Sequence, residues 1–123
     1  MDLLLGLDIG STNIKANFYD VKGRLVSGGS KTTLLSHPDK DHPNWSVWDP
    51  DIIWGAVKDS ISSALEKLDL KGDIKSVSVT GFGMDGVLID KSGNWLYPFI
   101  SWHCPRTEKQ CLQWSKEVGA DIS

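Results

Sequence analysis

Apolar and polar positions follow one another along the first part of the chain in patterns typical of strands. Residues 3–7 form a continuous apolar run, which is expected of a strand buried on both faces. After a Gly-Ser-Thr turn at 10–12, apolar and polar residues alternate over 14–19, the period of a half-buried strand. Residues 20–23 read Asp-Val-Lys-Gly, which suits a type I turn closing a hairpin. The pattern therefore predicts three consecutive antiparallel strands.

The spacing of apolar residues changes to that of a helix after residue 49. Asp49 is a favourable N-cap, and Pro50 suits the first helical position. One apolar stripe follows at helical spacing, formed by Ile53, Ala56, Val57, Ile61, Ala64, Leu65 and Leu68. We expect Gly72 to end this helix.

A further strand, a second hairpin and a second helix are predicted after it. Valines alternate with Ser and Thr over residues 74–81, and a strand reached through a crossover helix is most simply parallel to an earlier strand. Residues 90–93 repeat the Asp-x-x-Gly turn, and Pro105 opens the last helix. The proline-rich residues 36–50 are predicted to be a loop whose two tryptophans need cover. This order of elements predicts a mixed α/β layer arrangement.

Length and charge exclude several classes of partner. The chain has 123 residues, about one domain. Its formal net charge is -3 and it has no basic block, so we do not expect it to bind nucleic acid. No apolar run approaches ~18 residues, and the N-terminus lacks the basic region of a signal peptide. We expect no membrane partner and a cytoplasmic location.

The two cysteines, Cys104 and Cys111, are seven positions apart. In a helix that spacing is a rise of ~10 Å, beyond the ~7 Å limit between the Cα atoms of a disulfide. We interpret both as free thiols in a reducing compartment. Cys104 precedes the last predicted helix, where a thiolate would be stabilised, but no base is near and we interpret it as structural.

A first candidate site follows the opening strand. Asp8 ends the apolar run, and Gly10, Ser11 and Thr12 follow it. One interpretation is a hairpin turn with polar residues facing water; the other is a turn whose backbone N–H groups hold a phosphate. Ser11 and Thr12 would add hydroxyl donors and Lys15 a positive charge. Asp8 would lie beside a polyphosphate only with a divalent metal between them.

A second candidate site follows the predicted parallel strand. Glycines at 81, 83 and 86 bracket Phe82, Met84 and Asp85, at the end of a strand where open α/β sheets bind ligands. Asp85 either grips vicinal hydroxyls with both carboxylate oxygens or satisfies the loop backbone in an Asx turn.

Arg106 lies near the start of the last predicted helix, where the helix dipole disfavours a cation. One interpretation is an ion pair with Glu108 or Glu117 at the surface. The other is a partner elsewhere in the fold, and the sequence leaves both open.

With both candidate sites in view, the chain resembles the FGGY carbohydrate kinases, which have the actin-like, ribonuclease H-like ATPase fold. "GLDIGSTNIKANFYD" resembles the first phosphate motif of that family. The resemblance implies that ATP and Mg²⁺ are the cofactors and that Asp8 holds the metal. The implied nucleotide-binding residues are Asp8, Gly10, Ser11, Thr12 and Lys15.

"GFGMDGVLIDKSGNWLYPFISWHCPRT" is similar to the segment with which the family holds its sugar. The resemblance places Met84 and Asp85 on the sugar-contacting pair, with Trp102 and Arg106 shaping the far wall. Cys104 stands where xylulokinase-like members usually carry an aspartate, which favours the fuculokinase branch over the pentulose branch.

Family members are several times longer than this chain. The resemblance implies that residues 1–123 are the first part of the N-terminal, sugar-binding domain and an incomplete domain. The catalytic base is then expected downstream of Ser123, and the chain alone is expected to be inactive. The implied activity is ATP-dependent phosphorylation of a ketose, with L-fuculose as the expected substrate and L-fuculose 1-phosphate as the product. The alternatives are a rhamnulose or xylulose kinase, or a non-catalytic sugar- or nucleotide-binding module; the resemblance also allows a homodimer.

Overall fold

The computed structural model of the chain describes residues 1–69 and 72–119. They fall into two compact units, which are described separately. The sheet unit comprises Met1–Leu34 and Asp49–Met84, and the loop unit comprises Leu35–Trp48 and the chain from Asp85 onward. Among the helices described, none has both the length and the apolar character needed to cross a bilayer.

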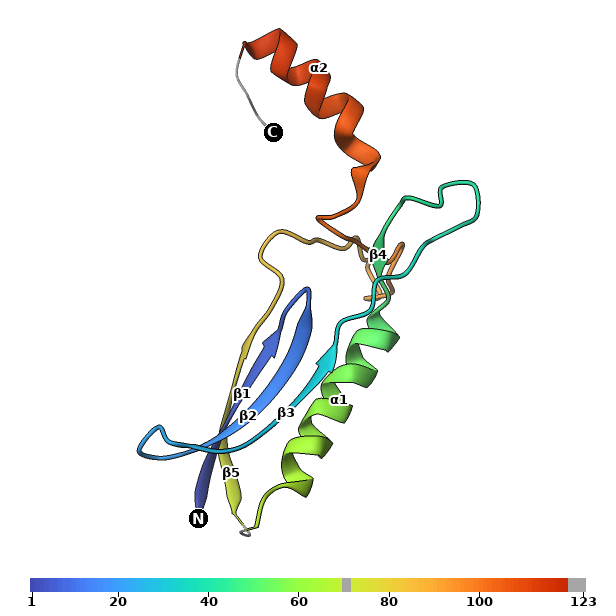
Figure 1. Cartoon of the computed structure of the whole chain (residues 1–123). Coiled ribbons are helices and arrows are strands. Elements are labelled where there is room, and N and C mark those ends of the chain that lie inside the picture. The colour runs from blue at the N-terminus through green and yellow to red at the C-terminus, as the bar shows by residue number, and fades with distance from the viewer. Residues whose placement is uncertain (70–71, 120–123) are drawn as a thin grey trace. The chain divides into compact units, whose positions relative to one another are not determined.

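A four-stranded mixed sheet forms the sheet unit (Figure 1). β1 (Asp2–Ile9), β2 (Asn13–Asp20) and β3 (Leu25–Thr32) are consecutive and antiparallel. β5 (Asp73–Thr80) pairs with the other edge of β1 in the parallel sense, so the order is β3-β2-β1-β5. The three predicted antiparallel strands and the predicted parallel strand are confirmed.

The turn between β2 and β3 has the structure that its sequence predicts. The backbone N–H of Gly23 donates to the carbonyl of Asp20 (2.9 Å), and Gly23 has a φ of 78°, in the left-handed region. The Asp20 carboxylate accepts from the backbone N–H of Arg24 (3.0 Å), from the Arg24 Nε (2.7 Å) and from the Lys22 N–H (2.9 Å). These donors, led by Arg24, hold the pKa of Asp20 below its ordinary value.

Helix α1 (Pro50–Glu66) begins where the sequence predicts. Asp49 is the N-cap, and its Oδ1 accepts from the backbone N–H groups of Asp51 (2.8 Å) and Ile52 (3.3 Å). These bonds satisfy amides that have no partner inside the helix, and proline at the first helical position has no N–H to satisfy.

The helix ends earlier than predicted. Its C-cap is Lys67, so the expectation that Gly72 ends the helix is wrong. Gly72 instead lies against the start of β1, because a Cβ at this position would be 2.6 Å from Cδ1 of Leu3 and 2.7 Å from the carbonyl oxygen of Met1. A close approach of two chain segments, which periodicity does not reveal, accounts for this glycine.

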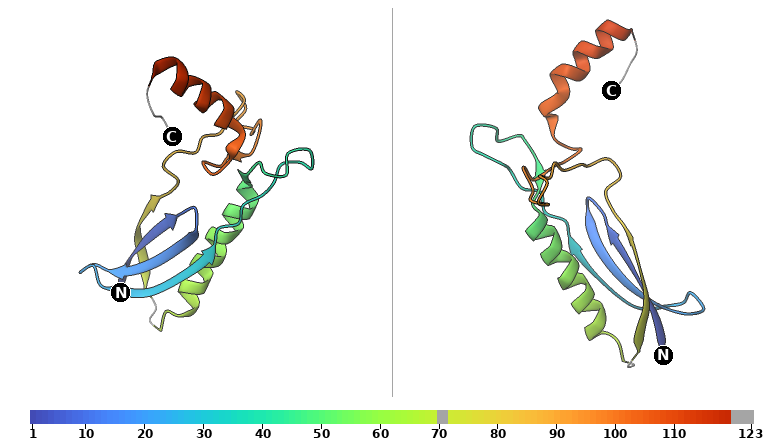
Figure 2. Two further views of the ribbon diagram at one scale, coloured as in Figure 1. Left: turned by 45° about the horizontal axis from the view of Figure 1, so that its top comes forward. Right: turned by 180° about the vertical axis from the view of Figure 1, so that it is seen from behind.

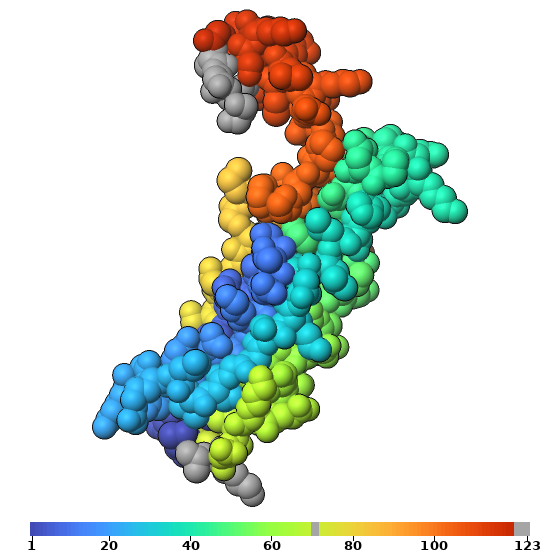
Figure 3. All heavy atoms as spheres, viewed as in Figure 1, coloured from blue at the N-terminus to red at the C-terminus, as the bar shows by residue number. Residues whose placement is uncertain are grey.

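α1 packs against β3 and β2, on one side of the sheet (Figure 2). A Cβ on Gly29 of β3 would lie 2.2 Å from the carbonyl oxygen of Ser60, so the helix and strand backbones meet there. The Ser27 hydroxyl also donates to the carbonyl of Ala64. In the space-filling view, the atoms of α1 and β3 lie directly against each other (Figure 3).

The core of the sheet unit lies between α1 and one face of the sheet. Its buried strand residues are Leu3, Leu5, Ile14, Ala16 and Phe18. On the opposite face of β1, Leu4 and Gly6 are only half-buried, and β5 is exposed along its whole length. The prediction that residues 3–7 are buried on both faces is therefore wrong for this chain, because α1 covers a single face.

The loop unit contains a short two-stranded sheet and a turn. β4 (Val47–Trp48) pairs antiparallel with β6 (Phe99–Ile100). The second Asp-x-x-Gly turn is confirmed by a bond from the Gly93 N–H to the carbonyl of Asp90 (3.1 Å) and by a φ of 84° at Gly93. It closes on one isolated bridge rather than on a pair of full strands.

The last helix starts at the predicted proline. Residues Pro105–Thr107 form the 3₁₀ turn η1, and α2 (Glu108–Val118) continues from it. Gly119, with a φ of 65°, caps α2 in the left-handed conformation. Of the two tryptophans in the 36–50 loop, Trp48 is fully buried and Trp45 is half-buried, as the need for cover predicted.

Candidate functional site

The carboxylate of Asp8 lies on the open face of the sheet. Asp8 is exposed near the end of β1, and its register partners are Lys15 on β2 and Thr80 on β5. Side chains of register partners project from the same face of a sheet. Asp8 and Thr80 also line a hollow of about 320 Å³ on that face, together with Asn17 and Ser78 of the neighbouring strands.

The turn after β1 is held by backbone and side-chain bonds. Gly10 N–H donates to the carbonyl of Asn13 (3.1 Å), and the Thr33 hydroxyl donates to the carbonyl of Gly10 (2.6 Å). Thr33 N–H donates to the carbonyl of Thr12 (3.0 Å). The carbonyl groups of Gly10 and Thr12 therefore accept from Thr33, just after β3, and the Gly10 N–H is bonded to β2, so the turn is fixed before any ligand is considered.

Two amide groups of the same turn, those of Ser11 and Thr12, are not engaged. Among the described residues, the backbone N–H groups of Ser11 and Thr12 have no acceptor. A Cβ on Gly10 would lie 2.8 Å from the Asn13 carbonyl oxygen and 3.7 Å from Oδ1 of Asp8, so glycine keeps the turn tight beside the carboxylate. Free amides in a tight turn are suited to an anion.

Asp8 fits a magnesium ion that binds together with phosphate. Within residues 1–69 and 72–119, no three His, Cys, Asp or Glu side chains gather into a metal cluster. A cage made only of protein ligands is therefore absent from the described chain. Mg²⁺ usually keeps several waters and binds through one or two carboxylates plus substrate phosphates. One exposed carboxylate beside unused amides matches that chemistry.

In the loop unit, the carboxylate of Asp85 is held by two N–H donors. Oδ2 accepts from the indole Nε1 of Trp48 (2.5 Å), and Oδ1 accepts from the backbone N–H of Trp102 (2.9 Å). Asp85 therefore satisfies a backbone N–H of the loop unit, but 17 positions away rather than in the local Asx turn that the sequence offered. Each carboxylate oxygen has a second lone pair, so the group can still accept hydrogen bonds from a ligand.

Exposed side chains lie next to Asp85 in the chain and in its hydrogen-bond network. The Trp102 ring is 58% exposed and stacks on His103, with 3.6 Å between ring centroids. Met84, the chain neighbour of Asp85, is 87% exposed. The result is an oriented carboxylate with an exposed aromatic ring beside it, an arrangement suited to a small polyhydroxy ligand.

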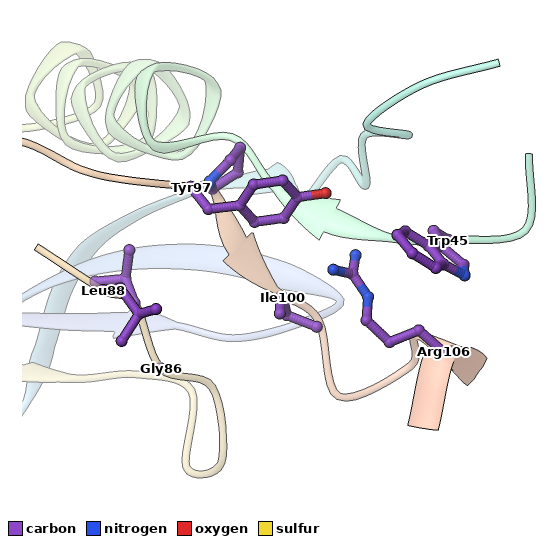
Figure 4. Close-up of a pocket in the computed structure, with 8 residues that line it drawn as sticks. Trp45, Gly86, Leu88, Tyr97, Ile100 and Arg106 are labelled. Carbon is purple, nitrogen blue, oxygen red and sulfur yellow. The ribbon is translucent and has the colours of Figure 1, made fainter. Parts of the chain in front are cut away.

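Arg106 belongs to a different cluster. Its Nε donates to Sγ of Cys104 (3.1 Å), and its guanidinium lies 4.3 Å from the Trp45 ring centroid and 5.4 Å from that of Tyr97. Among the described residues it forms no ion pair with Glu108 or Glu117, so the surface-pair interpretation is wrong and the partner elsewhere is found. Figure 4 shows the guanidinium pointing toward Tyr97 beside an apolar pocket of about 460 Å³.

Cys104 acts as an acceptor in this cluster. Burial by itself would raise the pKa of its thiol, but the bond from Arg106 and a second from the Ser46 backbone N–H (3.3 Å) outweigh that cost. The pKa of Cys104 is therefore lowered. Its bonds tie η1 to the segment before β4, which agrees with a structural role.

Sequence reasoning missed Trp48 and Tyr97. The spacing of Trp45 and Trp48 in a proline-rich loop was a signal that the indoles do more than pack. No sequence signal pairs Trp48 with Asp85, because the two residues are 37 positions apart. Tyr97 carried no signal beyond its place after the second turn.

Comparison with known proteins gives concordant results. Residues 3–122 match the N-terminal domain of the FGGY family of carbohydrate kinases. The chain is 40% identical over 109 residues to the L-fuculokinase of Salmonella typhi, which covers 86% of this chain and 22% of that protein. It is 30% identical over 118 residues to the xylulose kinase of Klebsiella pneumoniae, covering 96% and 24% of the two chains.

The fold agrees with these sequence comparisons. The crystal structure of gluconate kinase from Lactobacillus acidophilus superimposes with a TM-score of 0.77 at 24% identity, over 96% of this chain and 23% of that one. The fold is thus the actin-like ATPase fold, present here as part of a domain. The chain spans under a quarter of the length of these relatives. Because the family match extends over nearly every residue, the chain belongs to the FGGY family of carbohydrate kinases.

Proposed function

We propose that this chain is the first part of the N-terminal domain of a kinase that transfers phosphate from ATP to a ketose. The observation that carries the proposal is the end of β1. There the exposed Asp8 carboxylate lies beside a turn whose Ser11 and Thr12 amides have no acceptor among the described residues. An anion-binding turn next to a lone carboxylate suits a nucleotide phosphate with its metal.

Each residue at this turn is proposed to make a different contact with ATP or its metal ion. The amides and hydroxyls of Ser11 and Thr12 would donate to phosphate oxygens, and Gly10 keeps the backbone close. Lys15, the register partner of Asp8, would add positive charge on the same face. Asp8 would hold Mg²⁺ through water. The bound ion would supply neutralisation of the negative charge on the phosphates.

Asp85 and its neighbours would hold the sugar. The remaining lone pairs of Asp85 would accept from vicinal hydroxyls, while Trp102 and Met84, the chain neighbour of Asp85, would contact the carbon skeleton. Arg106 would shape the far wall through its contacts with Trp45 and Cys104.

We expect the rest of the machinery outside this chain. Phosphoryl transfer needs the metal, the nucleotide and an in-line hydroxyl positioned together. The catalytic base is expected downstream of Ser123, so the 123 residues alone are expected to be inactive. Both cysteines are free thiols in the structure, which is compatible with the cytoplasmic location that we propose. A homodimer is compatible with the proposal.

L-fuculose is the proposed substrate, giving L-fuculose 1-phosphate. The 40% identity to an L-fuculokinase supports it. The second candidate substrate is xylulose or rhamnulose, two other ketoses. Of these two, xylulose is favoured by the 30% identity to a xylulose kinase.

A substrate panel tests the proposal. The full-length protein is incubated with ATP, Mg²⁺ and L-fuculose, L-rhamnulose or D-xylulose, and ADP formation is followed. We expect the highest kcat/KM with L-fuculose. Faster turnover of another ketose would overturn the substrate and keep the kinase, whereas no ADP with any ketose would overturn the kinase.

A further inference from the structure

The indole of Trp48 is buried and aimed at a carboxylate. Trp48 is 0% exposed in β4, where it pairs with Phe99 of β6. Its Nε1 lies 2.5 Å from Oδ2 of Asp85. The indole nitrogen is a donor only, and a buried indole N–H needs an acceptor. Asp85 supplies that acceptor.

The two donors to Asp85 leave the carboxylate little rotational freedom. One oxygen is held by the side chain of Trp48 and the other by the backbone N–H of Trp102. Hydrogen bonds to an ionised acceptor are shorter and stronger than neutral ones. A carboxylate fixed at both oxygens presents its remaining lone pairs in one direction.

The surroundings of Trp48 fix the indole itself. Its ring meets that of His103 edge-on, with 6.5 Å between centroids, and His103 stacks on Trp102. Three aromatic rings and the β4–β6 pairing therefore define where the Nε1–H points. Packing therefore sets the orientation of the Trp48 indole, and the single hydrogen bond from its Nε1 orients the Asp85 carboxylate in turn.

We propose that Trp48 is a positioning residue for sugar binding: its indole N–H holds Asp85 in the orientation that accepts two neighbouring hydroxyls of the ketose. The inference rests on the proposed function. Trp48 does not touch the sugar in this scheme. Losing the N–H would leave Asp85 held at one oxygen only, so ketose affinity would fall while the phosphate-binding turn stays intact.

The first experiment replaces Trp48 by phenylalanine in the full-length protein. Trp48→Phe keeps an aromatic ring in β4 and removes the donor. We expect KM for the ketose to rise about tenfold, as for loss of a hydrogen bond to a charged group. We expect kcat and KM for ATP to stay within about twofold. An unchanged ketose KM, or equal losses for ketose and ATP, would overturn the inference.

A matched control removes an indole N–H outside this network. Trp95 packs edge-on against Phe99, and Trp95→Phe makes the same chemical change. We expect ketose KM to be unchanged in that variant. An increase equal to that of Trp48→Phe would show a general effect of losing a tryptophan and overturn the inference.

A coupling test separates positioning from packing. In an Asp85→Ala background, Trp48→Phe is expected to add little, because the acceptor that Trp48 positions is already absent. Fully additive increases in KM would contradict the inference.

If Trp48→Phe does not fold, 3-benzothienylalanine at position 48 replaces the N–H by sulfur with nearly the same shape. The same rise in ketose KM is then expected, and no rise overturns the inference.

Titration calorimetry of the ketose without ATP distinguishes failure of the proposed function from failure of the inference about Trp48. A wild-type protein that neither binds nor phosphorylates any ketose sinks the proposed function, and this inference with it. A wild-type protein that does both, with a Trp48→Phe variant that binds equally well, sinks the inference alone.

Discussion

At the scale of single residues, the aspartates differ in how many donors their carboxylates already have. Asp20 and Asp90 close turns and accept from several N–H groups, and these bonds lower the pKa of both. Asp85 accepts from two donors. Asp8 accepts from none within the described residues. Asp8 also lies beside the turn whose Ser11 and Thr12 amides have no acceptor among the described residues, and this combination suits it to a metal that binds with phosphate.

The role of Asp8 predicts a loss of activity without loss of fold. Asp8→Asn in the full-length protein is expected to lower kcat by at least about a hundredfold, because metal-assisted charge neutralisation contributes several kcal/mol. The unfolding midpoint is expected to stay the same, since the side chain is exposed. Asp2→Asn, on the first residue of the same strand, is the control and is expected to be fully active. A fully active Asp8→Asn enzyme would refute the metal role.

The donors to Asp20 predict a pH-dependent contribution to stability. The folded pKa is lowered, so the stabilisation is present above the unfolded pKa of about 3.9 and is lost as pH falls through the folded value. Asp20→Asn is expected to unfold at a lower temperature than the wild type at pH 7. The gap is expected to close as the pH falls below about 4. Thermal unfolding at several pH values measures it, and a constant gap down to pH 3 would count against this account.

At the scale of elements, the position of α1 depends on glycine in β3. The strand and helix backbones meet at Gly29, and the bond from Ser27 to Ala64 ties the same two elements together. This contact ties α1 to β3, and β3 pairs with β2, which follows the turn after β1. The turn that we propose to bind phosphate is thus supported from the opposite face of the sheet.

Gly29→Ala tests that contact. The added methyl group would lie 2.2 Å from the Ser60 carbonyl oxygen and 2.8 Å from the Ala64 nitrogen, so the helix must shift. We expect the free energy of unfolding to fall by about 1–3 kcal/mol. Gly55→Ala is the control in α1, because nothing lies within 4 Å of its Cβ position. It is expected to stabilise the protein by about 0.5–1 kcal/mol. Denaturant unfolding measures both, and a neutral Gly29→Ala would argue against the close approach.

At the scale of the whole molecule, the chain consists of two compact units, and each carries one of the two candidate sites. Its family relatives are more than four times as long as the segment matched here. β5 is exposed along its length, with Val77 and Val79 more than half exposed. The valines that alternate with Ser and Thr along this strand are therefore open to solvent in this chain.

The isolated 123-residue chain is expected to bind ATP with Mg²⁺ weakly. The turn after β1 is proposed to contact phosphate, but we expect the adenosine pocket outside this chain. Titration calorimetry measures the binding. Affinity equal to that of the full-length protein would show that the turn binds ATP unaided and would contradict the expectation of an incomplete site.

The sequence by itself determined the features whose causes are local. The cap at Asp49 and the Asp-x-x-Gly turns depend on residues within four positions of one another. They can therefore be recognised in the sequence without knowledge of the tertiary contacts. Strand alternation and the helical stripe also place the elements correctly. Motif resemblance identified the family, because it compares residue types and needs no coordinates.

Only the tertiary structure decided which distant groups meet. It assigned Gly72 to a contact with Leu3 and gave Arg106 its partners Cys104 and Trp45. It also brought the Trp48 indole to Asp85 across 37 positions. Hydrogen-bond partners of this kind depend on how packed elements approach one another. No periodicity along the chain encodes that approach, because it arises from the burial of whole faces.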